Sequence, residues 1–163
     1  MKNKTQKLTS CIWYSTQAEE AVNYYISLFK DGEITSLTKY GEGEHGKPGT
    51  VRTISFKLFG QEFLAINGGD YFKLSEAFSI IIACDTQEEI DLYWDKLSEG
   101  GEKQMCGWVK DKFGLSWQIT TPIISNVATK CSPEIFGELV KDILKMKKID
   151  ISVLSKYEKY YNS

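Results

Sequence analysis

The chain has 163 residues, enough for one domain with a hydrophobic core or for two small modules fused in sequence. Its composition, 42% hydrophobic and 26% charged with a net charge of −2, is that of an ordinary globular protein and offers no basic stripe for nucleic acid. The longest apolar run, residues 77–84, is far shorter than the about 20 residues of a membrane-spanning helix, so we expect no membrane insertion either.

The start of the chain and the cysteines both indicate a cytoplasmic protein. The opening residues, "MKNKTQKLTS", carry lysines but no apolar stretch, so they do not have the pattern of a secretion signal. Four cysteines lie far apart without any C-x-x-C pair, and we expect them to be reduced thiols: Cys11, Cys84, Cys106 and Cys131.

The first half of the chain predicts one helix and four strands. A strand-like run is followed by Thr16, a plausible helix cap, and then by acidic residues that suit the start of a helix. The helix is expected to run to about Phe29 and to end at the Asp31-Gly32 turn. The four expected strands cover residues 9–15, 33–40, 50–58 and 62–66.

The second half repeats this order in a shorter form. A strand is expected over 78–85, a helix over 86–98, and three short strands within 102–121. The segment "CGWVKDKFGLSWQI", residues 106–119, lies within these three strands, and we expect its turns near Gly107 and Gly114.

The two halves are related by an internal repeat. Shifting residues 19–33 by 69 positions gives six identities in fifteen positions, among them Tyr24 on Tyr93. A second match, at an offset of 54, places Phe59-Gly60 on Phe113-Gly114. We therefore predict an α+β fold made of two strand–helix–three-strand (βαβββ) modules.

The last quarter of the chain has no counterpart in the first module. A helix is expected from Ser132 as cap, with Pro133 at its first position, and a second short helix follows with Asp150 as a possible cap. The predicted organisation is one domain over 1–122, with modules at about 8–69 and 77–122, and a helical tail over 123–163.

Five segments give the chain a family resemblance: "WYSTQAEEAVNYYISLF", "FLAINGG", "ACDTQEEIDLYWDKLSEGGE", "CGWVKDKFGLSWQI" and "MKKIDI". With them the chain resembles the PhnB-like group, also labelled 3-demethylubiquinone-9 3-methyltransferase domain proteins, of the vicinal oxygen chelate (glyoxalase/bleomycin resistance) superfamily. The resemblance implies paired curved sheets that enclose a small-molecule pocket. It also implies a homodimer, for which the apolar stripe Ile135, Leu139 and Ile143 offers a surface, unless that stripe packs on its own domain.

In metal-using relatives, the first and last strands of each module supply four ligands, normally His, Glu or Gln. The corresponding positions here are Ser10, Leu64 (Ala65 if the register slips by one), Ser79 and Gln118. Two hydroxyls, a hydrocarbon and one neutral amide do not make a transition-metal site. We therefore predict no metal site and no cofactor.

Strand alternation provides the candidate ligand-binding residues. It places Ser10, Ile12 and Tyr14 together facing the pocket, Ser79 with Ile81 and Ala83 likewise, and Gln118 on the pocket face while Trp117 packs against the helices. Trp13 is then expected in the core. The candidate ligand-binding residues are Ser10, Tyr14, Asn67, Ser79, Trp108 and Gln118.

Several of these candidates have a structural alternative. Asn67 is better suited to cap a turn and Trp108 to fill the core, and Gln118 is equally suited to hydrogen-bond within the sheet. The single histidine, His45, lies in a loop and is expected to be solvated. The single arginine, Arg52, is expected at a solvent-facing strand end, with a pocket mouth as the alternative.

Three functions remain open from the sequence. The first, which we rank highest, is the binding of an unidentified small molecule in the cavity between the sheets without a catalytic metal. The second is an enzyme, either a metal-dependent lyase, isomerase or dioxygenase of the superfamily or the methyltransferase of the family label. The third is an interaction protein that acts through its tail helices. Against a methyltransferase, the first strand runs into "TQAEEA" without a glycine-rich loop.

Overall fold

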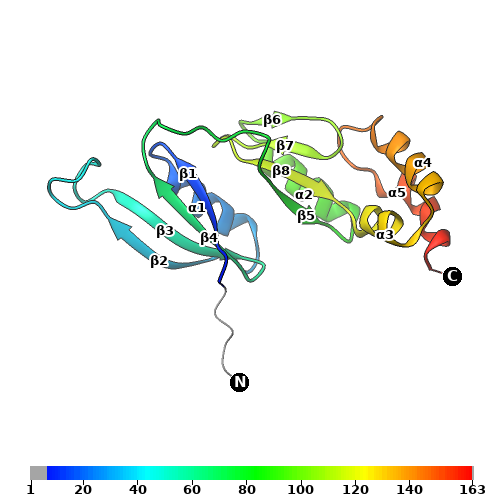
Figure 1. Ribbon diagram of the computed structural model, residues 1–163, viewed down its shortest axis with the longest axis horizontal. Coiled ribbons are helices and arrows are strands. Elements are labelled where there is room, and N and C mark those ends of the chain that lie inside the picture. Colours follow the sequence, from blue (N-terminus) through cyan, green and yellow to red (C-terminus); the bar gives the residue numbers. More distant parts are fainter. Residues whose placement is uncertain (1–6, 163) are drawn as a thin grey trace, which may run out of the picture. The chain divides into compact units, whose positions relative to one another are not determined.

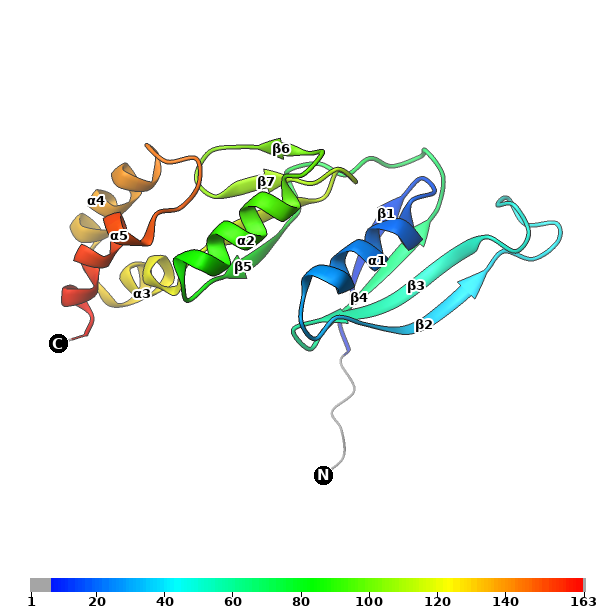
Figure 2. The same ribbon diagram turned by 180° about the vertical axis from the view of Figure 1, so that it is seen from behind.

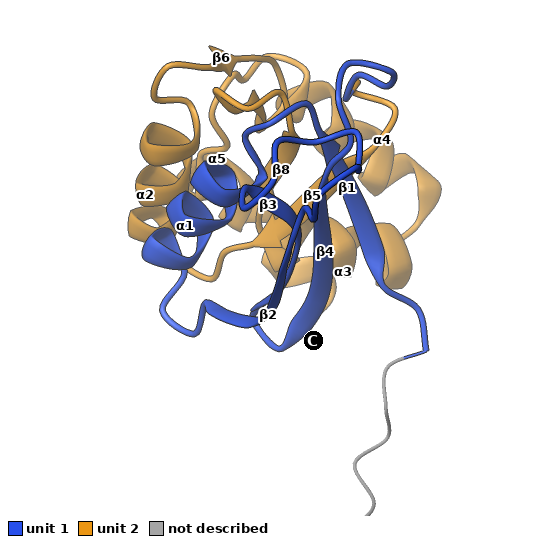
Figure 3. Ribbon diagram, turned by 90° about the vertical axis from the view of Figure 1, so that its left-hand side faces the viewer, with its two compact units in different colours: residues 1–74 blue, residues 75–163 orange. Residues whose placement is uncertain are grey.

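The computed structural model describes residues 7–162, which fall into two units, Met1–Leu74 and Ser75–Ser163 (Figure 3). The expectation that residues 1–10 are not a secretion signal falls partly on residues 1–6, which lie outside the described residues. Among the described residues, no helix is long and apolar enough to cross a membrane.

Unit 1 is a four-stranded sheet with one helix. Its strands lie side by side in the order β1-β4-β3-β2 (Figure 1). The β1–β4 pair is parallel, and the other pairs are antiparallel. The elements are β1 (Ser10–Tyr14), α1 (Ala18–Leu28), β2 (Glu33–Lys39), β3 (Val51–Leu58) and β4 (Gln61–Asn67).

Unit 2 begins with the same arrangement, built from shorter strands in the order β5-β8-β7-β6 (Figure 1). Its elements are β5 (Ser79–Ala83), α2 (Gln87–Leu97), β6 (Glu102–Lys103), β7 (Trp108–Lys110) and β8 (Ser116–Thr120). Tyr24 lies in α1 and Tyr93 in α2, as the repeat requires. The predicted duplicated α+β fold is therefore confirmed.

Each helix covers one face of the sheet in its own unit (Figure 2). In unit 1, the side chains of Ala21, Val22 and Tyr25 are fully buried, as are those of Ile54 and Ala65 on the sheet. In unit 2, the buried helix residues Ile90, Tyr93, Trp94 and Leu97 lie with the buried strand residues Val109, Trp117 and Ile119. Each apolar core thus lies between a helix and one sheet face, which leaves the other face for function.

Three helices and a 3-10 helix form the end of unit 2: α3 (Pro122–Lys130), α4 (Pro133–Ile143), α5 (Ile151–Leu154) and η1 (Ser155–Tyr160). Asp150 caps α5 as predicted, because its side chain accepts the N–H of Ser152 at 2.9 Å. Helix α3 was not predicted, although Pro122 at its first position and the buried pair Ile123 and Val127 are typical helix signals.

The tail is attached to the second sheet by backbone hydrogen bonds and to α2 by the side chain of Gln87. The N–H groups of Cys106 and Gly107 donate to the carbonyls of Met146 and Lys147 at 2.9 and 2.7 Å. The Gln87 side chain donates to Ile149 O and accepts the N–H of Ile151. Leu139, from the stripe considered for pairing, is fully buried within this unit.

Candidate functional site

We call the side of each sheet that its helix does not cover the open face. In unit 1, the open-face positions of β1 are Cys11 and Trp13, which pair in register with Leu64 and Ile66 of β4. In unit 2, the corresponding paired positions are Ile81 on β5 and Gln118 on β8. Ile81 is 61% exposed, so this face carries an uncovered apolar residue.

The predicted facing of β1 is wrong by one residue. Ile12 and Tyr14 are 1% and 3% exposed and lie on the helix side, whereas Trp13 lies on the open face and is only half-buried. The Tyr14 hydroxyl is 3.0 Å from the Tyr25 hydroxyl of α1, which confirms this direction. Because side chains alternate along a strand, Ser10 shares the helix side with Tyr14, and neither points to the open face.

Asn67 serves the fold at the end of β4. Its Oδ1 accepts the backbone N–H of Ala18 at 2.8 Å, and its Nδ2 donates to Val51 O at 2.9 Å. The side chain, 8% exposed, therefore caps α1 and ties it to β3. The expected cap at Thr16 is wrong: the N-cap residue is Gln17, whose side chain makes no capping bond.

The Trp13 side chain is fixed on the open face of unit 1 by residues that follow β4. Its Nε1 donates to Gly69 O at 2.9 Å, and its ring meets Phe72 edge-on at 4.9 Å between centroids. The indole lies directly on Gly68, since a Cβ there would be 2.0 Å from Trp13 Cζ2. The backbone after β4 therefore approaches this indole closely.

A hollow of about 510 Å3 lies beside Trp13, and we call it the Trp13 hollow. Its floor includes Ile66 and Thr53, which pair across β4 and β3, and Trp13 and Tyr71 add aromatic surface. The lining is Trp13, Tyr40, His45, Arg52, Thr53, Ile66, Gly68 and Tyr71. An apolar, ring-rich hollow with a few polar groups is the usual lining of a small-molecule site.

Tyr40 and His45 form one wall of the hollow. The buried Tyr40 hydroxyl is hydrogen-bonded to Asn67 O and lies 3.0 Å from His45 Nε2. A carbonyl oxygen only accepts, so the single phenolic proton goes to Asn67 O and the Nε2–H of His45 donates to Tyr40. His45 is exposed, as expected, and its hydrogen bond to Tyr40 also anchors its loop. A second hollow, of about 420 Å3, lies against the same two residues and contains Lys47.

Arg52 lies at the Trp13 hollow, which corresponds to the alternative of a pocket mouth. The pairing of β2 with β3 is irregular beside Arg52. Arg52 is exposed, although Ile54 and Phe56 on the same strand are buried. Its Nη1 donates to Glu44 Oε1 at 2.8 Å, and its Cζ lies 6.0 Å from the centre of the Tyr40 ring. Both partners hold the guanidinium group beside the hollow.

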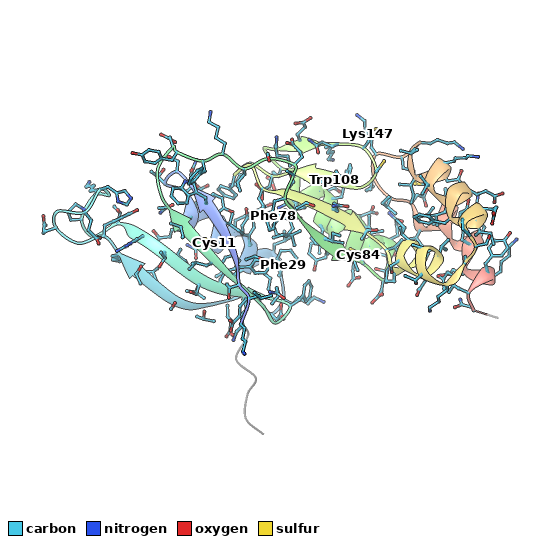
Figure 4. All side chains as sticks on the ribbon, in the orientation of Figure 1. Cys11, Phe29, Phe78, Cys84, Trp108 and Lys147 are labelled. Carbon is cyan, nitrogen blue, oxygen red and sulfur yellow. The ribbon has the colours of Figure 1, made fainter. Side chains whose placement is uncertain are left out.

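Three candidate residues come together on the open face of unit 2. Gln118 Nε2 donates to Ser79 Oγ at 2.8 Å, and Trp108 is paired in register with Gln118. All three side chains are half-buried. Phe78, just before β5, is exposed and adds an apolar ring to this unit (Figure 4). The sheet hydrogen bond considered for Gln118 is present, and it uses the amide nitrogen of the side chain.

Strand β8 is fixed from the helix side by Asp111. This buried carboxylate accepts the Nε1–H of Trp117 at 2.8 Å and the backbone N–H groups of Phe113 and Leu115 at 2.9 and 3.0 Å. Trp117 is fully buried, as its predicted position against the helix requires. The opposite direction of Gln118 follows from alternation along the strand.

Neither open face has the ligand chemistry of a transition-metal site. The paired first-strand and last-strand positions are Cys11 and Leu64 in unit 1 and Ile81 and Gln118 in unit 2. Within the described residues, no three His, Cys, Asp or Glu side chains form a group that could hold a metal ion. The residues present therefore do not fit the metal that chelating relatives use.

Cys11 and Cys84 lack the environment of a reactive thiol. Burial, together with the nearby carboxylates of Glu89 and Asp85, raises the pKa of Cys84 to about 12. Burial also raises the pKa of Cys11 on the open face. Neither thiol is activated as a nucleophile at neutral pH.

Comparisons with known proteins agree with this architecture. A sequence model described as 3-demethylubiquinone-9 3-methyltransferase matches residues 6–120, a range that ends at the last residue of β8. No curated protein matches the chain.

Two solved structures are similar over most of this chain. A protein of Bacillus cereus, described as a putative 3-demethylubiquinone-9 3-methyltransferase, PhnB protein, is 40% identical with a TM-score of 0.67 and covers 71% of this chain and 99% of its own. A Pseudomonas aeruginosa protein is 17% identical with a TM-score of 0.60, covering 72% of this chain and 98% of its own. The second likeness is one of fold alone.

Proposed function

Since the chain belongs to the PhnB-like, 3-demethylubiquinone-9 3-methyltransferase family, we propose that it binds a small molecule on the open faces of its sheets, without a catalytic metal. The observation that carries the proposal is the Trp13 hollow. Its volume of about 510 Å3 lies within the roughly 300–1,000 Å3 of ligand pockets. Its tryptophan is already fixed by Gly68 and Gly69, so binding does not have to order this ring.

The second unit offers a polar group on its own open face. Gln118 is held by Ser79, and its amide can still accept from a ligand donor while Trp108 lies beside it. In this proposal, Gln118 orients a polar ligand group and does not coordinate a metal. The open-face pairs Cys11 with Leu64 and Ile81 with Gln118 support a metal-free site by their chemistry.

The methyltransferase of the family label is the less favoured function. Common S-adenosylmethionine-dependent methyltransferases use a doubly wound parallel sheet with a glycine-rich loop after its first strand. Here each described sheet has a single parallel pair, and Ser15, Thr16 and Gln17 connect β1 to α1. No glycine is available at this connection to approach a cofactor.

Binding of the uncharged fluorescent probe phenylnaphthylamine tests the proposal. The wild-type protein should raise the probe's fluorescence in a saturable way, and Trp13→Ala should weaken that binding about tenfold or more. Thr53→Phe, which fills the hollow without removing Trp13, should weaken it as well. Phe59→Ala, an exposed ring on the β3–β4 turn, is the matched control and should bind normally.

Circular dichroism of each variant keeps a binding defect separate from a folding defect. A folded Trp13→Ala and a folded Thr53→Phe that both bind the probe like the wild type would contradict the proposed site. A folded Trp108→Ala that binds the probe like the wild type would show that the open face of unit 2 does not bind it.

We also propose a cytoplasmic homodimer. Superfamily relatives commonly pair or exchange units, and the exposed Ile81 and Phe78 are apolar groups that a second copy could cover. The four free cysteines, Cys11, Cys84, Cys106 and Cys131, suit a reducing compartment. Light scattering at high protein concentration should give twice the chain mass, and a monomer mass would contradict the dimer.

A further inference from the structure

The Trp13 hollow combines aromatic surface with one permanent positive charge. None of its eight lining residues is acidic, and Arg52 is its only lysine or arginine. Trp13, Tyr40 and Tyr71 contribute rings. An arginine beside aromatic faces is suited to a flat ligand that carries a carboxylate, sulfonate or phosphate, because its planar fork binds such groups through two parallel hydrogen bonds.

The partner of Arg52 is a carboxylate that lies outside the hollow. Glu44 Oε1 accepts from Arg52 Nη1 at 2.8 Å, while its Oε2 accepts the backbone N–H of Gly41 at 2.8 Å. Glu44 is therefore fixed at the base of the 41–50 loop and directs the guanidinium group. The Arg52 and Glu44 side chains are 50% and 36% exposed, so their ion pair is worth little and is readily exchanged for another anion.

We propose that the ligand of the Trp13 hollow is a planar aromatic anion, whose negative group takes the place of Glu44 on Arg52 while its ring lies against Trp13. This inference rests on the proposed function and names its ligand class. Glu44 has two roles in it: it positions Arg52 in the free protein and competes with the ligand's anionic group. Arg52 acts as the residue that selects acids over neutral rings.

Two probes with the same rings separate charge recognition from ring binding. Anilinonaphthalene sulfonate is the sulfonated counterpart of the uncharged phenylnaphthylamine. The wild-type protein should prefer the sulfonate by about tenfold. Arg52→Gln should abolish this preference and leave the affinity for the uncharged probe within about twofold. Glu44→Gln should raise the affinity for the sulfonate severalfold, because the competing carboxylate is gone.

The Lys57–Glu33 ion pair provides a matched control, since it lies on the same sheet, at 3.0 Å, between residues paired across β2 and β3. Lys57→Gln and Glu33→Gln should leave both probe affinities unchanged, which shows that a change in net charge alone has no effect. If Arg52→Gln keeps the preference, or Glu44→Gln weakens sulfonate binding, the inference is wrong. Binding of the uncharged probe with no preference for the sulfonate overturns this inference alone. Failure of both probes to bind overturns the proposed function with it.

Discussion

The Oδ1 atom of Asn67 accepts the backbone N–H of Ala18 at 2.8 Å, so the last residue of β4 caps the first turn of α1. In unit 2, the same task belongs to Thr86, which precedes α2 directly and accepts the N–H of Glu89. The two copies thus cap equivalent helices with residues from different places in the sequence. In unit 1, the cap also links the helix to the strand that ends beside Trp13.

Asn67→Ala should therefore destabilise the protein by about 1 to 3 kcal/mol, because it leaves both the Ala18 N–H and the Val51 carbonyl without their partner. Urea unfolding measures the loss. The control is Asn23→Ala, which removes an exposed asparagine from α1 and should change stability by less than about 0.5 kcal/mol. Equal effects of the two substitutions would contradict the capping role.

Gly68→Ala should disturb the Trp13 hollow, because Gly68 lies directly against the indole of Trp13. The added methyl group would lie 2.0 Å from Trp13 Cζ2, so the indole has to move. We expect a changed near-ultraviolet circular dichroism spectrum and weaker binding of phenylnaphthylamine. Gly41→Ala is the matched control, because no atom lies within 4 Å of a Cβ there. An unchanged spectrum and affinity in Gly68→Ala would show that Trp13 is not positioned by this glycine.

The duplicated fold could be predicted because both copies preserve the spacing of their helices, which places Tyr24 on Tyr93 at an offset of 69. The facing of β1 could not be predicted from that offset. The register pairs Cys11 with Leu64 and Ile81 with Gln118, so the first strands are related by 70 and not by 69. A shift of one residue reverses the direction of every side chain in a strand.

The signal for this shift is present in the sequence. Thr16-Gln17 matches Thr86-Gln87 at an offset of 70, while Glu19-Glu20 matches Glu88-Glu89 at 69, so one residue is extra in the first copy. That extra residue changes the cap as well, since Thr86 starts α2 but Thr16 does not start α1. The Trp13 hollow could not be predicted, because it depends on the correct register of β1 and on the conformation of the loop 41–50. No strand or helix pattern predicts the conformation of that loop.

The tail should lose stability in acid through Asp142. Its carboxylate pairs with Lys156 at 2.7 Å, accepts the Tyr157 hydroxyl at 2.9 Å and pairs with Lys145 at 3.1 Å, and these bonds hold the pKa of Asp142 below its usual range. A carboxyl whose pKa is lower in the folded than in the unfolded state stabilises the fold above the unfolded pKa of about 4. This stabilisation is lost as pH falls from there through the folded pKa.

Hydrogen exchange of α5 and η1, followed from about pH 6 down to about pH 3, measures the effect. Protection should fall with pH in the wild type, and Asp142→Asn should be less protected at pH 6 and less dependent on pH. Asp95→Asn, which removes a carboxylate of α2 that pairs with Lys103 of β6, is the control. A wild-type tail with constant protection over this range would contradict the role of Asp142.

S-adenosylmethionine should not bind. The short connection of Ser15, Thr16 and Gln17 between β1 and α1 has side chains at every position, whereas a nucleotide-type loop needs glycine for close backbone approach. Titration calorimetry should show no saturable heat with S-adenosylmethionine, with anilinonaphthalene sulfonate as the positive control on the same sample. Tight binding of S-adenosylmethionine would support the activity of the family label.

The last prediction concerns Gln118, which should contribute to ligand binding but not to metal content. Its Nε2 donates to Ser79 Oγ, so the amide is oriented with a neutral hydroxyl as its neighbour, and Ile81 occupies the paired position on β5. A neutral amide beside a hydroxyl and a hydrocarbon cannot offset the cost of removing water from a divalent ion. Gln118→Leu should therefore weaken probe binding while metal content stays at background.

Metal analysis of protein purified without chelators or affinity tags decides this prediction, with Ser79→Ala as the companion variant. Ser79→Ala removes the hydroxyl that holds the amide, so it should weaken binding less than Gln118→Leu does. Near-stoichiometric zinc, nickel, iron or manganese that disappears in Gln118→Leu would establish a metal site instead. Probe affinity that neither variant changes would leave Gln118 as a residue that only stabilises the β5–β8 pair, because its one observed hydrogen bond joins these two strands.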